Sequence, residues 1–172
     1  MENREIKDSN NKKVTINVYN CVVSYVSRRA LESGKAIFYD IHFTRKSELS
    51  FVSVPASLLS EIMSESGYNC SVRAFNRTNE DFSKFFSGAK IEIFGVPFVK
   101  EQTKFLNPFT GIYTESNKPA KEDGISLHIS KLEPTEDNLN FDKEQSEDIN
   151  NGMKIERDAI RQATANYLAS LL

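Results

Sequence analysis

The chain has 172 residues, of which 39% are hydrophobic and 27% charged, and a formal net charge of -2. This length fits one folded domain with tails, and the composition excludes a wholly disordered or membrane-embedded chain. No apolar run approaches the ~18 residues of a spanning helix, and the polar start is not a secretory signal, so we expect a cytoplasmic protein. Cys21 and Cys70 are too few for a disulfide framework or a zinc cluster. We therefore expect no metal and no cofactor.

The charge is divided unevenly along the chain. Residues 1–132 carry 18 Lys and Arg against 15 Asp and Glu, whereas residues 133–172 carry 4 against 9. A basic body followed by an acidic segment is typical of proteins that handle nucleic acid, because the acidic segment can compete for the basic surface or recruit other proteins. The alternative is that the acidic segment is only a soluble linker.

The first part of the chain predicts a polar arm and then a β-hairpin. Residues 1–13 have no hydrophobic period and predict a disordered N-terminal arm. From Val14, apolar residues alternate with polar or tyrosine side chains, which predicts a strand over 14–29. Residues 35–46 alternate again, and a turn signal precedes them. The two runs therefore form a hairpin, with Phe38, Asp40, His42 and Thr44 on one face of its second strand.

The middle of the chain predicts a third strand and then a helix. Residues 48–54 read as the strand and end at Pro55, and Ser57 is the expected N-cap of a helix that ends near Gly67. Residues 69–76 and 81–86 predict a short strand and a helical turn.

The later segments predict two more strands and a separate helix. Residues 89–99 alternate as a strand, in which Gly95 and Pro97 suggest a bulge or an edge. Residues 101–123 form a long polar loop, of a length that is usually functional or mobile, and residues 124–132 form the last strand. Residues 133–152 predict a flexible acidic linker. Residues 153–172 predict an amphipathic helix with one face made of Ile155, Ala159, Ala163, Tyr167 and Leu171.

The order of these elements resembles that of the five-stranded OB barrel, with three strands, a helix, a fourth strand, a long connection and a closing strand. The stretches FFSGAKIEIFG (Phe85–Gly95) and GISLHISKLEP (Gly124–Pro134) resemble the second half of bacterial and phage single-stranded DNA-binding proteins of the OB family. In that family a KG-x-x-V-x-V-x-G strand precedes the fourth loop. The resemblance implies a mainly β fold, with an OB-like Greek-key barrel and one or two short helices over residues 14–132.

The chain also departs from that family. It has no Trp, it carries an insertion around residues 69–78, and it ends in a predicted helix instead of a short acidic tip with a terminal Pro-Phe. With these departures, the chain resembles a phage, plasmid or mobile-element relative of the family more than a housekeeping member.

Binding of single strands requires cationic side chains for phosphates and aromatic faces for bases. Basic and aromatic residues interleave where the alternation points away from the expected core, and Tyr19 belongs to the same pattern. The candidate binding residues are Tyr25, Arg28, Arg29, Lys35, Phe38, Arg45, Arg73, Phe75, Arg77, Phe94, Phe98, Lys100, Lys104, Phe105, Phe109 and Tyr113. The alternative for each ring is a place in the core of a small barrel, and a slip of one residue would invert the two faces of a strand.

Catalysis finds little support in the sequence. His42 and His128 are the only histidines, each on an alternating strand, and a solvent-facing or structural role is the commoner one for such residues. No phosphate-binding glycine loop, metalloprotease motif or nucleophile elbow is present. We therefore expect a protein that is not an enzyme.

Two functions remain open from the sequence. The first is a sequence-nonspecific single-stranded DNA-binding protein that coats exposed strands in replication, recombination or DNA transfer. The second is a non-catalytic protein-interaction module of a phage or mobile element, favoured by the small positive charge of the body. We expect a homo-oligomer that is not membrane-bound, and Met153–Leu172 either packs on the barrel or in an oligomer contact, or docks in a groove of a protein partner.

Overall fold

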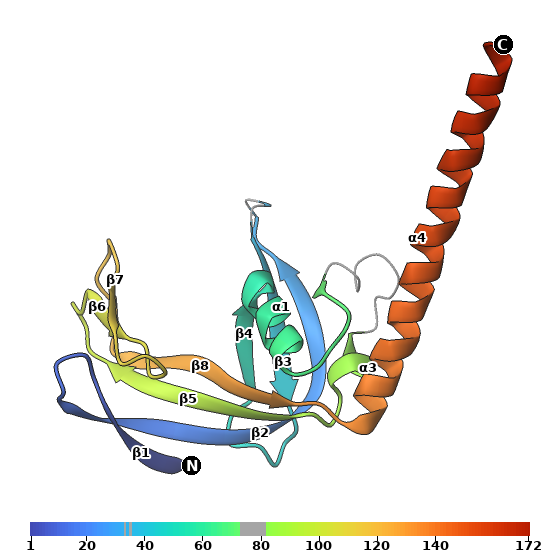
Figure 1. Cartoon of the computed structure of the whole chain (residues 1–172). Helices are drawn as coiled ribbons and strands as arrows, with labels where there is room; N and C mark the ends of the chain where they lie inside the picture. Colours follow the sequence, from blue (N-terminus) through green and yellow to red (C-terminus); the bar gives the residue numbers. More distant parts are fainter. Residues whose placement is uncertain (33, 35, 73–81) are drawn as a thin grey trace.

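The computed structural model describes residues 1–32, 34, 36–72 and 82–172 (Figure 1). The fold is mainly β, as the sequence predicted, and it ends in a long helix. In chain order the elements are β1 (Glu2–Lys7), β2 (Lys13–Ala30), β3 (Ile37–Phe43), β4 (Phe51–Pro55), α1 (Ala56–Glu65), α3 (Ser83–Phe86), β5 (Lys90–Phe98), β6 (Lys104–Leu106), β7 (Tyr113–Glu115), β8 (Gly124–Glu133) and α4 (Glu136–Ser170). None of the described helices is both long and apolar enough to cross a membrane.

The main sheet is antiparallel and has the strand order β4-β3-β2-β5-β8, with β1 beside β2. The sheet has two parts that share β2. The first half of β2 pairs with β1 and β5, next to β8, and its second half pairs with β3, next to β4. A register shift lies between Val23 and Tyr25, and Figure 1 shows β2 bending upward out of the plane of β5 and β8. Among the described residues β4 and β8 do not pair with each other, so the sheet is not closed.

The hydrophobic core lies where the two parts of the sheet meet helices α1 and α3. Tyr39, Ile41, Leu59, Phe85 and Ile93 are almost completely shielded from solvent there. Burial of each such side chain contributes about 1.5–3 kcal/mol. This core confirms the predicted inward face of the second hairpin strand, and it also takes Tyr19, which the sequence offered as a binding residue.

A second, smaller cluster lies on the other side of β2 and β5. It consists of Ile16, Val18, Phe94, Val96 and Leu106, and Tyr113 packs against it. The last two come from β6 and β7, which form a hairpin within the segment that the sequence predicted to be a long loop. The hairpin therefore covers this side of the sheet.

Neighbouring side chains leave no room for a Cβ atom at Gly95, and this close packing, not the suggested bulge, explains the glycine. A Cβ atom at this position would lie 2.9 Å from Ile125 Cγ2 and 2.9 Å from Tyr19 Cε2. The irregularity in β5 lies instead between Glu92 and Ile93, opposite β8. The pairing of β5 with β2 ends at Gly95, so Pro97 lies beyond it, in the position expected for proline at an edge.

The N-terminal segment is a strand, although the sequence predicted a disordered arm. Strand β1 pairs with β2 from Glu2 opposite Val18 to Lys7 opposite Lys13. In the turn that follows, the Asp8 carboxylate accepts hydrogen bonds from the backbone N–H groups of Asn10 and Lys12, at 3.0 and 2.9 Å. Backbone pairing therefore orders a segment whose side chains are almost all exposed.

The helical predictions are confirmed with shifted boundaries. Helix α1 begins at Ala56 after Pro55, without a side-chain cap from Ser57, and Gly67 follows its end with a positive φ of 92°. Helix α3 lies within the predicted helical turn at 81–86. Residues 69–72 of the predicted strand at 69–76 are not in a strand, and residues 73–76 lie outside the described residues.

The acidic segment is helical, although the sequence predicted a flexible linker over 133–152. Helix α4 runs without a break from Glu136 to Ser170, and Thr135 and Asn138 form a capping box at its start. Its first turns pack on the body, where Asn138 Nδ2 donates to the backbone oxygens of Lys84 and Ser87. The predicted helix at 153–172 is therefore the second half of one long helix (Figure 1).

Candidate nucleic-acid interface

Strands β2, β3 and β4 present one face to the core and the other to solvent. Tyr39 and Ile41 point inward, so their neighbours Asp40 and His42 point outward. The register places Tyr25 beside His42 and His42 beside Phe51, which gives a row of three rings across three strands. We call Tyr25, His42 and Phe51 the aromatic row.

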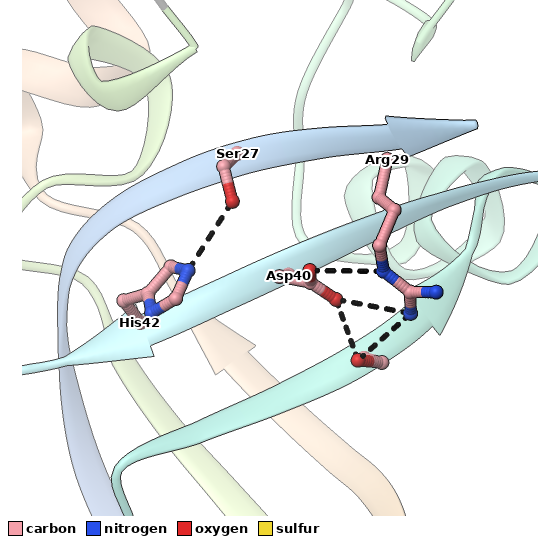
Figure 2. A network of polar contacts seen from close by, with 5 residues as sticks. Ser27, Arg29, Asp40 and His42 are labelled. Atoms are coloured by element: carbon pink, nitrogen blue, oxygen red, sulfur yellow. Dashed lines mark hydrogen bonds and ion pairs between the residues drawn. The ribbon is translucent and has the colours of Figure 1, made fainter.

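The rings of the aromatic row contact one another and remain open to solvent. The centroids of Tyr25 and His42 are 4.3 Å apart with nearly parallel planes, and those of His42 and Phe51 are 5.8 Å apart. His42 Nε2 also shares a 3.2 Å hydrogen bond with the Ser27 hydroxyl, which fixes the orientation of the ring (Figure 2). Tyr25 is 48% exposed and Phe51 is 52% exposed. Such a preformed aromatic surface has free ring faces on which a further planar group could stack.

The same face carries a polar network next to the aromatic row. Arg29 Nε donates to the Asp40 carboxylate at 3.2 Å, and the Ser53 hydroxyl donates to the same carboxylate (Figure 2). The bond from Ser53, followed by the bond and charge of Arg29, lowers the pKa of Asp40 below its usual value. The guanidinium also lies 5.4 Å from the ring centroid of Phe38. Arg29 is thus held in place on the outer face, while half of its side chain stays exposed.

Further cations lie near the other end of the aromatic row. Arg45 and Lys46 are exposed in the turn that joins β3 to β4, directly after the strand residues that carry His42. Arg29 and this turn therefore place positive charge on two sides of the row. We call the aromatic row together with Arg29, Phe38, Arg45 and Lys46 the outer patch.

The structure gathers part of the predicted set in the outer patch. Tyr25, Arg29 and Phe38 lie on the outer face, and Arg45 lies in the adjoining turn. Arg28 is exposed, but it is paired with Tyr39 and so lies on the opposite side of β2 from Arg29. Lys35, Arg73, Phe75 and Arg77 lie outside the described residues.

The remaining predicted residues lie around the β6–β7 hairpin, away from the outer patch. Phe94 stacks on Phe109 at 5.2 Å, and Phe98 meets Phe105 edge to face at 5.8 Å. The Tyr113 hydroxyl donates to the Asp8 carboxylate at 2.9 Å. Phe94 lies within the second cluster and Tyr113 packs against it, as the alternative interpretation of the sequence allowed. Only Phe109 stays half exposed among the three aromatic residues of the predicted loop.

The two predicted lysines of this region are exposed. Lys104 Nζ lies 3.8 Å from a Glu115 carboxylate oxygen, and the backbone N–H of Lys100 donates to the Asp123 carboxylate. Acidic neighbours therefore reduce the positive charge that this hairpin presents.

His42 and Phe51 were not among the predicted binding residues. His42 had been placed on the outward face, but as a histidine it was weighed only as a general base. Phe51 begins a strand of its own, and only the register between β3 and β4 brings it beside His42. The missing information was the alignment of the strands, which alternation within a single strand does not supply.

Comparison with known proteins does not assign this arrangement to a family. No family model matches the chain, and neither a curated protein nor a solved structure matches it. Among the described residues, no group of three His, Cys, Asp or Glu side chains is placed to hold a metal ion.

Proposed function

We propose that this protein binds single-stranded DNA without sequence preference through the outer patch, and coats exposed strands in replication, recombination or DNA transfer. The observation that carries the proposal is the aromatic row, whose end members stay about half exposed, with Tyr25 stacked on His42 and Phe51 tilted against it. Bases stack on such side chains irrespective of their identity, and each stacked base contributes ~1–3 kcal/mol.

The strand order supports an OB-like assignment within this proposal. Strands β2, β3 and β4 follow one another as antiparallel neighbours, and β5 returns through α1 and α3 to lie on the other side of β2. This is the Greek-key order, and the OB fold is a partly open Greek-key barrel of five strands. Helix α1 contacts both β4 and β8, and so it bridges the two unpaired ends of the sheet.

The position of the outer patch on the sheet also supports the proposal. The OB fold uses its second and third strands as the platform for oligonucleotides. In this chain those strands correspond to β3 and β4, which carry His42, Phe38 and Phe51. The platform and the exposed rings therefore coincide.

The charges of the outer patch supply the second requirement, which is contact with phosphates. Arg45 and Lys46 can each neutralise one phosphate beside the stacked bases, whereas the charge of Arg29 is already offset by Asp40. Each neutralised phosphate of a single strand lowers the logarithm of the affinity by ~0.7 per tenfold rise in salt. Two such contacts predict that binding weakens roughly 12-fold between about 50 and about 300 mM salt.

A fluorescence-anisotropy titration tests the proposal. The full chain is titrated into labelled oligo-dT and into a duplex of the same length, at both salt concentrations. The proposal predicts binding to the single strand in preference to the duplex, with the salt dependence given above. Absence of binding to oligo-dT at low salt, or equal binding to the duplex, would overturn it.

A further inference from the structure

The second half of α4 has no partner among the described residues. The first half packs on the body through Asn138 and Asp142, which are buried, and through Phe141 and Ile149. From Asn150 onward every residue is exposed, and Figure 1 shows this part of the helix standing away from the rest of the molecule. Most helical stability in proteins comes from packing of an amphipathic face, so contact with another surface would stabilise this part of α4.

The exposed half nevertheless carries an apolar stripe. Met153, Ile160, Tyr167 and Leu171 recur on one face of a helix with 3.6 residues per turn, in line with Ile149, which already packs against the body. The stripe lies on the same face as Asn138 and Asp142, so it continues the face that packs on the body.

The stripe reads the same in both directions about Ile160. A second α4 running antiparallel would place Ile160 on Ile160 and Met153 on Tyr167, and it would end with Leu171 beside Ile149, at the edge of the contact with the body. A two-fold symmetric contact requires this kind of self-complementary spacing. The polar positions match as well, because Glu156 would face Thr164.

A parallel pair would not fit equally well. It would set Glu156 of one chain against Glu156 of the other, which is a repulsive contact. It would also bring the two bodies to the same end of the helix pair. Both would lie on the face that meets the partner helix, because the face that carries the stripe also packs on the body. An antiparallel pair keeps the bodies at opposite ends.

From these observations we propose that the second half of α4 is a dimerisation element, and that its partner is a second copy of the chain, antiparallel and centred on Ile160. This proposal is independent of the DNA-binding proposal, and its test contains no nucleic acid.

Sedimentation equilibrium over roughly a hundredfold range of protein concentration measures the association. The natural chain is expected to shift from 19.5 kDa toward twice that mass as its concentration rises. Ile160→Asp sets two carboxylates face to face and is expected to leave a monomer at every concentration. A natural chain that stays monomeric throughout would overturn the proposal.

Ile155→Asp is the matched control. Ile155 is 70% exposed against 66% for Ile160. The helical face predicted from the sequence grouped Ile155 with Tyr167 and Leu171, but 3.6 residues per turn place it about 120° from Tyr167 and about 140° from Ile160 around the helix. The control should dimerise like the natural chain, and equal loss of the dimer in both variants would contradict the assignment of the stripe. Helical content measured by circular dichroism shows whether either substitution unfolds α4.

Disulfide cross-linking tests the orientation, since Cys21 and Cys70 are buried. A mixture of Met153→Cys and Tyr167→Cys chains should form a mixed cross-linked dimer. Met153→Cys alone should not. Efficient cross-linking of Met153→Cys with itself would show a parallel pair and overturn the proposed arrangement.

Discussion

Asp142 attaches α4 to the body through a carboxylate instead of an apolar side chain. Its oxygens accept hydrogen bonds from the backbone N–H groups of Asn69 and Cys70, at 2.8 and 2.9 Å. The side chain is completely shielded from solvent. Since hydrogen bonds to a charged group are stronger than neutral ones, this single residue can fix the first turns of the helix on the segment that follows α1.

Replacement of Asp142 by alanine should therefore destabilise the whole fold. It leaves two N–H groups without their acceptor, each at a cost of about 1–3 kcal/mol, and we expect the free energy of unfolding to fall by about 2–6 kcal/mol. Urea denaturation followed by circular dichroism measures this difference. Glu144→Ala, an exposed acid on the same helix, is the control, and an equal effect of both substitutions would contradict the role of Asp142.

The outer patch shows how far single residues can be predicted. The alternation of residues 35–46 correctly placed Phe38, Asp40 and His42 on the outward face. The same reasoning offered Phe94 as a binding residue, although it is buried in the second cluster. Alternation separates the two faces of a strand, but it does not show which face another element will cover.

At the scale of elements, the sequence predicted best the strands that have one buried and one exposed face. Strand β2 was predicted at 14–29 and found at Lys13–Ala30, because its apolar residues repeat with period two. Strand β1 was missed because its side chains are exposed and charged, and backbone pairing holds it in place. The first half of α4 was missed because polar side chains, Asn138 and Asp142, make its contact with the body.

Asp8 links two elements that are distant in sequence, the β1–β2 turn and the β6–β7 hairpin. Hydrogen bonds from the Lys12 backbone N–H and, to a smaller extent, from the Tyr113 hydroxyl lower the pKa of this carboxyl. A carboxyl with a lowered pKa in the folded state stabilises the fold above its unfolded-state pKa, about 3.9, and the contribution disappears as the pH falls through the folded-state pKa.

We therefore expect Asp8→Asn to remove part of the acid sensitivity of the protein. Its melting temperature should lie below that of the natural chain at neutral pH, and the difference should shrink as the pH falls below about 4. Thermal melts at a series of pH values measure this difference. A constant difference between the two chains down to pH 3 would contradict the assignment to Asp8.

At the scale of the whole molecule, the boundary of the folded body lies inside α4. The charge pattern placed the end of the domain near Leu132, but Asn138, Phe141 and Asp142 all contact the body beyond that point. The folded body ends at the last residue of α4 that packs against the core, which is Ile149.

Two truncations test this boundary. At a protein concentration low enough to keep the full chain monomeric, a chain that ends at Asn151 should melt within about 2 °C of the full chain, because it loses only residues that are exposed in the monomer. A chain that ends at Glu133 loses the anchoring contacts of α4 and should melt about 10 °C lower or fail to fold. Equal melting temperatures for the two truncations would show that the first half of α4 is not part of the folded body.

The central claim is that single-stranded DNA binds to the outer patch, and one pair of substitutions tests it most directly. Phe51 and Phe109 are matched in type and exposure, at 52% and 50%, but only Phe51 belongs to the aromatic row. Loss of one stacked base, at ~1–3 kcal/mol, predicts that Phe51→Ala weakens binding of oligo-dT by about 5-fold to about 150-fold. Phe109→Ala should change the affinity by less than about twofold. Unchanged affinity in Phe51→Ala, or an equal loss in Phe109→Ala, would contradict the claim.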